Sequence, residues 1–321
     1  MILVFGGAGY IGSHSVKHLL ENGYDCVVAD NLVYGHKDAV LVKNFEKVDL
    51  KDKDGLDKLF KKYKIDTVIH FAAYAYVGES VVNPQKYYQN NVIGTLNLLD
   101  TMIANNVKKI VFSSTCAVYG NPEYTPIDEK HPQNPISPYG QSKLMIEKIM
   151  ADYQKAYNLK YIALRYFNAS GACDNAKIGE SHNPETHLIP LVLKAIKGDI
   201  KNITVFGTDY DNFDGTCIRD YIHVEDLALA HRLALEKLDE FNGYINLGTG
   251  IGTSVKEIIK TAEKVTGKKC PVIYGDRRAG DPPKLFANND MAKDVLGWEI
   301  KFNKIEDILK SAWEWEKNKL F

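Results

Sequence analysis

Two motifs that lie far apart along the 321 residues constrain this chain most strongly. The glycine-rich stretch Gly6-Gly7-Ala8-Gly9-Tyr10-Ile11-Gly12 follows the apolar run 2–5, and the pair Tyr139 and Lys143 lies well downstream. A strand, a tight glycine turn and a helix can hold a pyrophosphate, because the backbone approaches it closely and the helix N-terminus favours negative charge. A tyrosine one helical turn from a lysine can move a proton. Together the motifs predict hydride chemistry on an alcohol or ketone beside a bound dinucleotide.

The segment after the glycine loop indicates which dinucleotide is bound. Gly6, Gly9 and Gly12 form a tighter variant of the usual spacing, and a second apolar run, 26–29, ends at Asp30. A carboxylate at the tip of the second strand can bind both hydroxyls of an adenosine ribose. No arginine lies between residues 12 and 48, so a 2′-phosphate would find no guanidinium partner there. These features predict NAD rather than NADP.

The tyrosine and lysine are expected on one face of a helix. Ser137-Pro138 has the N-cap and first-turn residues that start a helix, here over about 138–158. Tyr139 and Lys143 are then i and i+4, one turn apart. A free tyrosine titrates near pH ~10, and a nearby ammonium or an oxidised nicotinamide favours its charged form. We therefore expect Tyr139 to act as a base near neutral pH, with Lys143 lowering its pKa and binding a ribose hydroxyl.

Hydroxyl side chains follow a third apolar run. Residues 109–113 are expected to form a buried strand, and Ser114 and Thr115 come directly after it. In a parallel α/β sheet the carboxyl ends of the strands line the ligand crevice. We expect these hydroxyls to hydrogen-bond a substrate alcohol and to align its proton with Tyr139.

Alternating apolar runs and helical stretches set the fold class. Such a pattern is typical of right-handed β-α-β units, and hence of an α/β protein with a doubly wound parallel Rossmann-type sheet. The apolar runs lie at 2–5, 25–29, 67–71, 109–113 and 161–165. From about Asn168 the pattern changes to polar loops, a helix near 187–198, a short strand at 203–206 and an amphipathic C-terminal helix at 303–317. This part predicts a smaller α/β domain for the substrate.

Composition fits a soluble cytoplasmic enzyme. The net charge of −1 argues against nucleic acid or an acidic membrane as the main partner, and no apolar run reaches membrane length. The first strand begins at Ile2, which leaves no room for a signal peptide. The five cysteines show no paired spacing, so neither a metal site nor a disulfide framework is expected.

Over essentially its whole length the chain resembles the UDP-hexose 4-epimerase family of extended short-chain dehydrogenases/reductases. The glycine loop and the tyrosine-lysine pair are shared across that superfamily. More particular to the epimerases are Val77-Gly78-Glu79-Ser80, Arg219-Asp220-Tyr221-Ile222-His223-Val224 and Arg278-Ala279-Gly280-Asp281. Other matching stretches are Asp30-Asn31-Leu32, Asp66–Ala73, Asn90–Thr95 and Arg165–Asn168.

The resemblance implies interconversion of UDP-galactose and UDP-glucose through a transient 4-keto sugar, with NAD held tightly. The implied catalytic residues are Tyr139, Lys143 and Thr115. The implied NAD-binding residues are Gly6, Gly9, Tyr10, Ile11, Gly12, Asp30, Asn31, Asp49, Leu50, Phe71, Ala72, Ala73, Asn90, Ser113, Tyr139, Lys143 and Tyr166. The implied substrate-binding residues are Ser114, Thr115, Tyr139, Asn168, His187, Leu188, Thr204, Phe206, Arg219, Tyr221, Arg278 and Asp281. The implied NAD-binding domain is 1–168 plus about 219–250, and the UDP-sugar-binding domain is 169–218 and 251–321.

Two departures from the family pattern bear on specificity. Ala75 stands where some epimerases have a lysine or histidine near the cofactor. Leu285 stands where a bulky tyrosine restricts some relatives to unmodified hexoses, whereas a small residue admits N-acetylhexosamines. Leucine is intermediate, so we expect UDP-galactose and UDP-glucose as the main pair, with some activity on UDP-N-acetylglucosamine and UDP-N-acetylgalactosamine.

Other functions stay open on this scaffold. A 4,6-dehydratase needs acids directly after the threonine, and Cys116 and Ala117 argue against one. A UDP-uronic acid 4-epimerase would need a partner for the sugar carboxylate, and a non-catalytic NAD sensor could dispense with Tyr139 and Lys143. The family also implies a homodimer, formed through the stretches 87–102 and 139–157.

Overall fold

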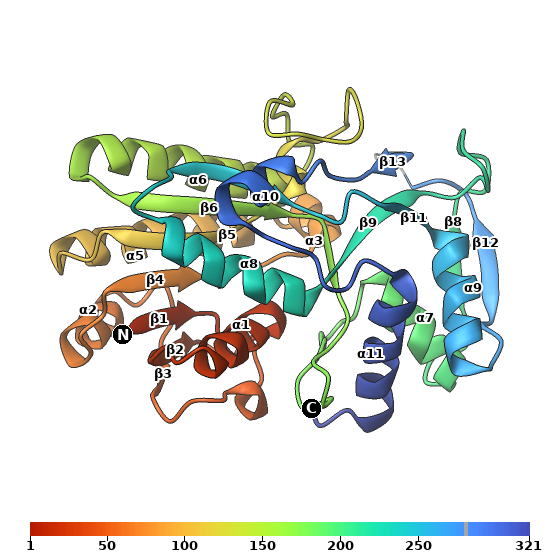
Figure 1. The fold of residues 1–321 in the computed structure, drawn as a ribbon, viewed down its shortest axis with the longest axis horizontal. Helices are drawn as coiled ribbons and strands as arrows, with labels where there is room; N and C mark the ends of the chain where they lie inside the picture. Colours follow the sequence, from red (N-terminus) through yellow and green to blue (C-terminus); the bar gives the residue numbers. More distant parts are fainter. Residues whose placement is uncertain (279–281) are drawn as a thin grey trace.

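A seven-stranded parallel sheet forms the centre of the computed structural model, which describes residues 1–278 and 282–321. Its strand order is β10-β6-β5-β4-β1-β2-β3 (Figure 1). The strands are β1 (Ile2–Phe5), β2 (Cys26–Asp30), β3 (Phe45–Lys47), β4 (Thr67–His70), β5 (Lys109–Thr115), β6 (Lys160–Tyr166) and β10 (Gly243–Leu247). The chain starts in the middle and winds outward in both directions, so the predicted doubly wound fold is confirmed.

Helices cover both faces of the sheet, which explains the continuous apolar runs of its central strands. Side chains of β1 alternate between the two faces. Ile2 and Val4 pack in the core that contains α1 (Tyr10–Glu21) and α8 (Val224–Lys237). Leu3 and Phe5 pack in the opposite core. Its helices are α2 (Lys53–Lys62), α5 (Gly94–Ala104) and α6 (Pro138–Tyr157).

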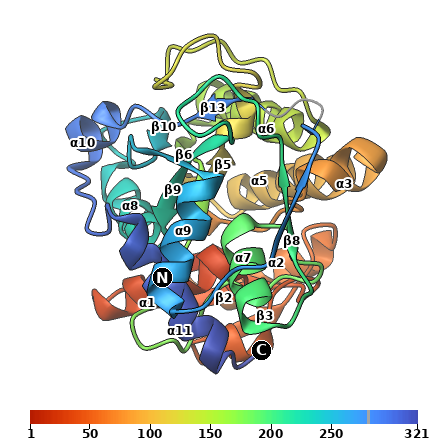
Figure 2. The same cartoon turned by 90° about the vertical axis from the view of Figure 1, so that its right-hand side faces the viewer.

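The second half of the chain builds a smaller α/β part at one end of the sheet (Figures 1 and 2). Its helices α7, α9 and α11 pack around a separate core. One sheet has the order β11-β9-β13 with β7 paired to β9, and β12 pairs with β8. The elements are β7 (Asn168–Ser170), α7 (Leu188–Lys197), β8 (Ile203–Phe206), β9 (Ile218–His223), β11 (Gly252–Ser254), α9 (Val255–Thr266), β12 (Val272–Gly275), β13 (Lys284–Leu285) and α11 (Ile305–Asn318).

Shorter elements lie between the strands and helices given above. They are α3 (Val77–Val82), α4 (Pro84–Tyr87), a π-helix (Tyr88–Ile93), 3₁₀ turns at Lys37–Ala39 and Cys116–Val118, and α10 (Asp290–Leu296). Across the described ranges, every helix is too short or too polar to cross a membrane. The division into an NAD-binding and a sugar-binding domain stays a prediction.

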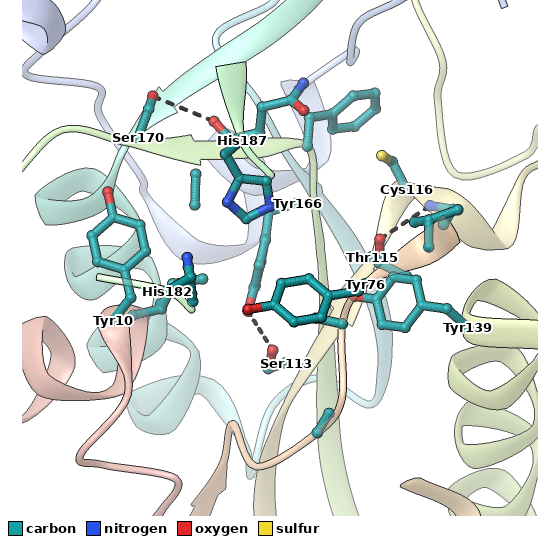
Figure 3. Close-up of a pocket in the computed structure, with 18 of the residues that line it drawn as sticks. Tyr10, Tyr76, Ser113, Thr115, Cys116, Tyr139, Tyr166, Ser170, His182 and His187 are labelled. Atoms are coloured by element: carbon teal, nitrogen blue, oxygen red, sulfur yellow. Dashed lines mark hydrogen bonds between the residues drawn. The ribbon is translucent and has the colours of Figure 1, made fainter. Parts of the chain in front are cut away.

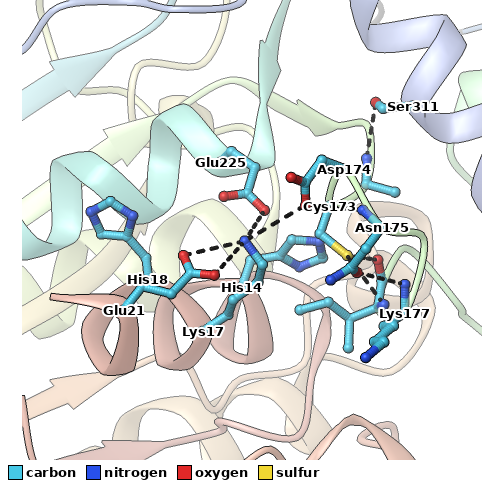
Figure 4. A network of polar contacts seen from close by, with 12 residues as sticks. His14, Lys17, His18, Glu21, Cys173, Asp174, Asn175, Lys177, Glu225 and Ser311 are labelled. Carbon is cyan, nitrogen blue, oxygen red and sulfur yellow. Dashed lines mark hydrogen bonds and ion pairs between the residues drawn. The ribbon is translucent and has the colours of Figure 1, made fainter. Parts of the chain in front are cut away.

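Lys17 connects three segments that lie far apart in the sequence (Figure 4). Its Nζ lies 3.1 Å from the Glu21 carboxylate on the same helix α1 and 3.4 Å from that of Glu225 on α8. The Asp174 carboxylate, on the loop after β7, is 4.0 Å away. These ion pairs hold the loop close to α1.

Candidate active site

A cavity of about 500 Å³ lies at the carboxyl ends of the central strands, between the large sheet and the smaller part. Both motifs predicted from the sequence line it, together with residues of the second half of the chain such as His187, Arg219 and Leu285. An adjoining hollow of about 100 Å³ shares Gly6 and Gly9 with the cavity. Its other lining residues include Asp30, Asn31, Leu50, Ala72 and Asn90.

The glycine loop leads from β1 into α1, and close packing explains two of its glycines. Gly6 has φ +86°, and a Cβ there would lie 2.5 Å from the Ala72 amide nitrogen. A Cβ on Gly12 would lie 2.2 Å from the Gly6 carbonyl oxygen. At Gly9 a Cβ would contact only the Gly6 oxygen, at 3.4 Å, and no side chain caps the helix that starts there. Space and the free N–H groups of a helix N-terminus therefore suit a pyrophosphate.

Asp30 lies at the far end of this loop, where β2 ends. Its carboxylate accepts hydrogen bonds from the backbone N–H groups of Ala8, at 3.1 Å, and Leu32, at 2.8 Å. Burial raises its pKa. Asn31 beside it donates to the Asp49 carboxylate at 2.9 Å. Asp49 itself does not line either hollow among the described residues, and it positions Asn31 instead.

Tyr139 and Lys143 both face the cavity from the first two turns of α6. The Ser137 side chain caps this helix by accepting from the Gly140 N–H at 3.2 Å, and Pro138 follows, as predicted. Burial raises the pKa of Tyr139 to about 12, and a hydrogen bond with the Thr115 hydroxyl acts in the opposite direction. Burial also lowers the pKa of Lys143 to about 7. Desolvation therefore outweighs the polar contacts of Tyr139, and its role as a base near neutral pH, which includes the charge of bound NAD, stays a prediction.

The hydroxyl residues at the end of β5 divide between the two faces of the sheet. Ser113 and Thr115 line the cavity, and the Ser113 hydroxyl hydrogen-bonds the Tyr166 hydroxyl (Figure 3). Ser114 points to the opposite side, because side chains alternate along a strand. Its hydroxyl donates to the Glu147 carboxylate at 2.5 Å, and that carboxylate pairs with the buried Arg165 guanidinium. The Ser114 side chain is therefore outside the cavity lining, on the side opposite to the one expected for a substrate contact.

The second half of the chain lines the other wall of the cavity. Asn168, His187, Leu188, Arg219 and Tyr221 are all part of it, as expected for a substrate site.

Three other predicted substrate residues do not line this wall. Among the described residues, Thr204, Phe206 and Arg278 are outside the cavity lining, because β8 lies at the outer edge of the smaller part. The Arg278 guanidinium lies 4.0 Å from the centre of the Phe206 ring. Asp281 is outside the described residues.

Comparison with known proteins identifies the family of this chain. Residues 2–248 match the NAD dependent epimerase/dehydratase family. The chain belongs to this family. A UDP-glucose 4-epimerase of Halalkalibacterium halodurans is 52% identical, over 98% of this chain and 95% of that protein. The crystal structure of UDP-glucose 4-epimerase from Brucella ovis in complex with NAD is 50% identical, with a TM-score of 0.95 over 98% of this chain and 97% of that one.

Another relative carries a broader printed activity. The UDP-Glc/GlcNAc 4-epimerase from Campylobacter jejuni is 42% identical, with a TM-score of 0.87 over 99% of each chain. Glucose and N-acetylglucosamine, one sugar from each pair that we considered from Leu285, therefore both occur among the names of the structural relatives of this epimerase/dehydratase family member.

Several cavity residues of this family member were missed by the sequence analysis. Tyr34, Tyr76, Glu180 and His182 line the cavity, the last two from the polar stretch before α7. Burial lowers the pKa of His182, but the Glu180 and Glu185 carboxylates outweigh burial and raise it to about 9. Burial raises the pKa of Glu180, but the His187 and His182 imidazoles outweigh burial and lower it to about 2. The spacing of acids and histidines in residues 180–187 was the available signal.

Proposed function

We propose that this protein is a UDP-glucose 4-epimerase, which interconverts UDP-galactose and UDP-glucose through a transient 4-keto sugar. One observation carries the proposal. Tyr139, one turn from Lys143 on α6, faces the same cavity as Thr115, the glycine loop and Arg219 from the second half of the chain. A proton-transfer pair, a pyrophosphate-binding loop and an anion-binding guanidinium thus meet in one space. The similarity to UDP-glucose 4-epimerases over the whole chain supports it.

The residues present fit a tightly held NAD. Gly9 and the N-terminus of α1 suit the pyrophosphate, Asp30 and Asn31 the adenosine ribose, and Lys143 the nicotinamide ribose. When bound, oxidised NAD accepts the hydride from C4 of the sugar, and its positive charge favours the Tyr139 phenolate. Ala75 lines the cavity where some relatives have a lysine or histidine near the cofactor. This chain therefore lacks the cofactor contact that such a side chain would make.

The residues of the chain divide the remaining work. Tyr139 takes the proton of the sugar 4-hydroxyl, with the Thr115 hydroxyl as its hydrogen-bond partner. Arg219 neutralises diphosphate charge, and Asn168 and His187 contact the nucleotide from the same wall. The 4-keto sugar turns about its link to the diphosphate and is reduced on its other face, so C4 is inverted without net oxidation.

The cavity also supports a second sugar pair. Leu285 on β13 lines it and packs against the core that contains Cys116 and Val118. Its side chain is smaller than a tyrosine and leaves room for an N-acetyl group. We therefore include UDP-N-acetylglucosamine and UDP-N-acetylgalactosamine as weaker substrates. A 4,6-dehydratase is disfavoured, since Cys116 and Ala117 follow Thr115 where acids would be needed.

We further propose a homodimer in the cytoplasm. Exposed apolar side chains gather on α3 and on the π-helix, where Val81 is 60%, Val82 83% and Ile93 42% exposed. These elements pack against α6, one of the predicted dimer helices. The five cysteines are all free and buried, as suits a reducing compartment.

Replacing Tyr139 by phenylalanine tests the proposed function. Tyr139→Phe should lower kcat by about 10²–10⁴-fold, the usual contribution of a positioned acid or base, while NAD content and thermal unfolding stay unchanged. Tyr24→Phe is a matched control, because the Tyr24 hydroxyl bonds Glu236 on the protein surface at 2.7 Å. Unchanged turnover in Tyr139→Phe would remove the proposal.

A further inference from the structure

Four ligand-type side chains converge in the loop that leads into α7. Glu180, His182, Glu185 and His187 each offer one oxygen or nitrogen, and these atoms lie within 4.8 Å of one another. Glu180, His182 and His187 also line the cavity. Figure 3 shows His182 beside Tyr10, on the side of the cavity away from Tyr139.

The contacts within this cluster meet at one place instead of forming separate pairs. The Glu180 Oε1 atom hydrogen-bonds the His187 Nδ1 atom and lies 3.3 Å from the His182 Nδ1 atom. The His182 Nδ1 atom is also 3.6 Å from Glu185 Oε2, and the His187 Nδ1 atom is 3.8 Å from Glu185 Oε1. Two nitrogens and two carboxylates therefore surround the same small volume.

Buried atoms without a hydrogen-bond partner provide a second, independent observation. The Glu185 side chain is only 3% exposed, and its Oε2 atom has no hydrogen-bond partner. The His182 Nδ1 atom is also buried without one, since its 3.3 Å approach to Glu180 lacks hydrogen-bond alignment. Glu185 Oε1 accepts from the backbone N–H groups of Thr186 and His187, at 2.8 and 3.0 Å, which holds the carboxylate in place. Buried polar atoms are costly unless something pairs with them.

We propose that Glu180, His182, Glu185 and His187 form a binding site for one divalent transition-metal cation such as Zn²⁺. Imidazole nitrogen and carboxylate oxygen are ligands that Zn²⁺ and its neighbours accept, and four donors suit a tetrahedral ion. The two carboxylates balance the charge of the cation. A single cation would pair with both buried atoms that lack a hydrogen-bond partner.

The position of the site suggests what the cation does. It lies in the wall of the cavity that we propose for the sugar nucleotide, so this role rests on the proposed function. A bound cation would hold Glu180, His182, Glu185 and His187 in one geometry in this wall of the cavity. Binding of the metal itself needs no substrate and can be tested separately.

The experiment uses the full-length protein, stripped with a chelator and titrated with Zn²⁺ or Co²⁺ in a calorimeter, without any nucleotide. We expect one site per chain, and for Co²⁺ the visible absorption of a tetrahedral complex. Glu180→Gln and His182→Gln should each weaken binding at least about tenfold, the lower limit even for changes in residues that only hydrogen-bond a metal ligand. His18→Gln is the matched control, because His18 contacts Arg232 on α8 at 3.2 Å and is not in the cluster.

The pH dependence of metal affinity gives a further readout, which does not depend on epimerase activity. Because imidazole ligands must be neutral and carboxylate ligands deprotonated, metal binding should release protons and weaken as the pH falls. The absence of saturable binding of either ion, or equal affinity in wild type and both cluster variants, would overturn the proposal. Loss of epimerase activity with intact metal binding would instead remove only the proposed function.

Discussion

The Lys143 ammonium donates a hydrogen bond to the backbone carbonyl oxygen of Ser113 at 2.7 Å, and so connects α6 to the end of β5. The side chain is buried, and its Nζ atom also lies 4.7 Å from the centre of the Phe112 ring. This contact fixes the helix that carries Tyr139 against the strand that carries Thr115. Tyr139 and its proposed hydrogen-bond partner Thr115 are thereby held in one geometry.

Lys143→Met should remove most epimerase activity and change how stability depends on pH. The buried lysine has a folded pKa of about 7, below its usual value of 10.5. Between these two pH values the unfolded chain binds more protons, so this group makes the wild type more stable as the pH rises. Below pH 7 its full destabilising effect remains.

Chemical denaturation of wild type and Lys143→Met from pH 6 to pH 10 checks this prediction. The free energy of unfolding of the wild type should rise relative to that of the variant across the range. A constant difference between the two proteins would show that the lysine is not desolvated.

Thr115→Val should lower kcat about 10- to 100-fold, because one hydrogen bond to the developing phenolate, worth about 1.5–3 kcal/mol, is lost. That hydrogen bond lowers the pKa of Tyr139, so the acidic limb of the pH–rate profile should also move to higher pH. Thr115→Ser keeps the hydroxyl and serves as the control. Equal pH profiles in the valine and serine variants would speak against the role given to Thr115.

The size of residue 285 should set the choice between sugar pairs. Leu285→Ala enlarges the cavity, and we expect kcat/KM for UDP-N-acetylgalactosamine to rise at least about tenfold relative to UDP-galactose, the scale of one steric contact. Leu285→Tyr should shift the ratio in the opposite direction. If the ratio of the two kcat/KM values does not follow the size of the side chain at position 285, the sugar binds elsewhere in the cavity.

Arg165→Met should destabilise the protein by about 3–5 kcal/mol, because it leaves a buried carboxylate without its partner. Arg165 is fully buried, and its Nε donates to Glu147 Oε1 at 3.0 Å. Lys61→Met, which breaks the exposed pair with Asp57, is the control and should cost at most about 0.5 kcal/mol. Urea denaturation measures both, and similar losses in the two variants would contradict the importance of burial.

The strands that could be predicted from the sequence are those that are buried on both faces of the sheet. Residues of β1 are buried on both faces of the sheet, so this strand is a continuous apolar run with glycines after it. The edge strand β3 consists of Phe45, Glu46 and Lys47, all partly or largely exposed, and shows no such run. The other edge strand, β10, comes from the second half of the chain and joins the sheet only through tertiary contacts with β6.

The site was predicted where a backbone motif fixes the position of a side chain. Gly9 and Tyr139 lie on helices whose start residues are visible in the sequence, and both line the cavity. Ser114 was assigned to the substrate side because its neighbours have the same chemistry, but strand alternation places it in the opposite core. Glu180 and Glu185 lie in an irregular loop, where no periodicity shows which side chains meet.

The most direct test of the proposed reaction is to incubate the purified protein with UDP-galactose, without added NAD, and to measure UDP-glucose. Formation of UDP-glucose is expected, with NAD, and not NADP, released when the protein is denatured. Conversion only after NAD is added would keep the reaction but show that the cofactor exchanges. If no UDP-glucose forms even with NAD present, the proposed reaction is wrong.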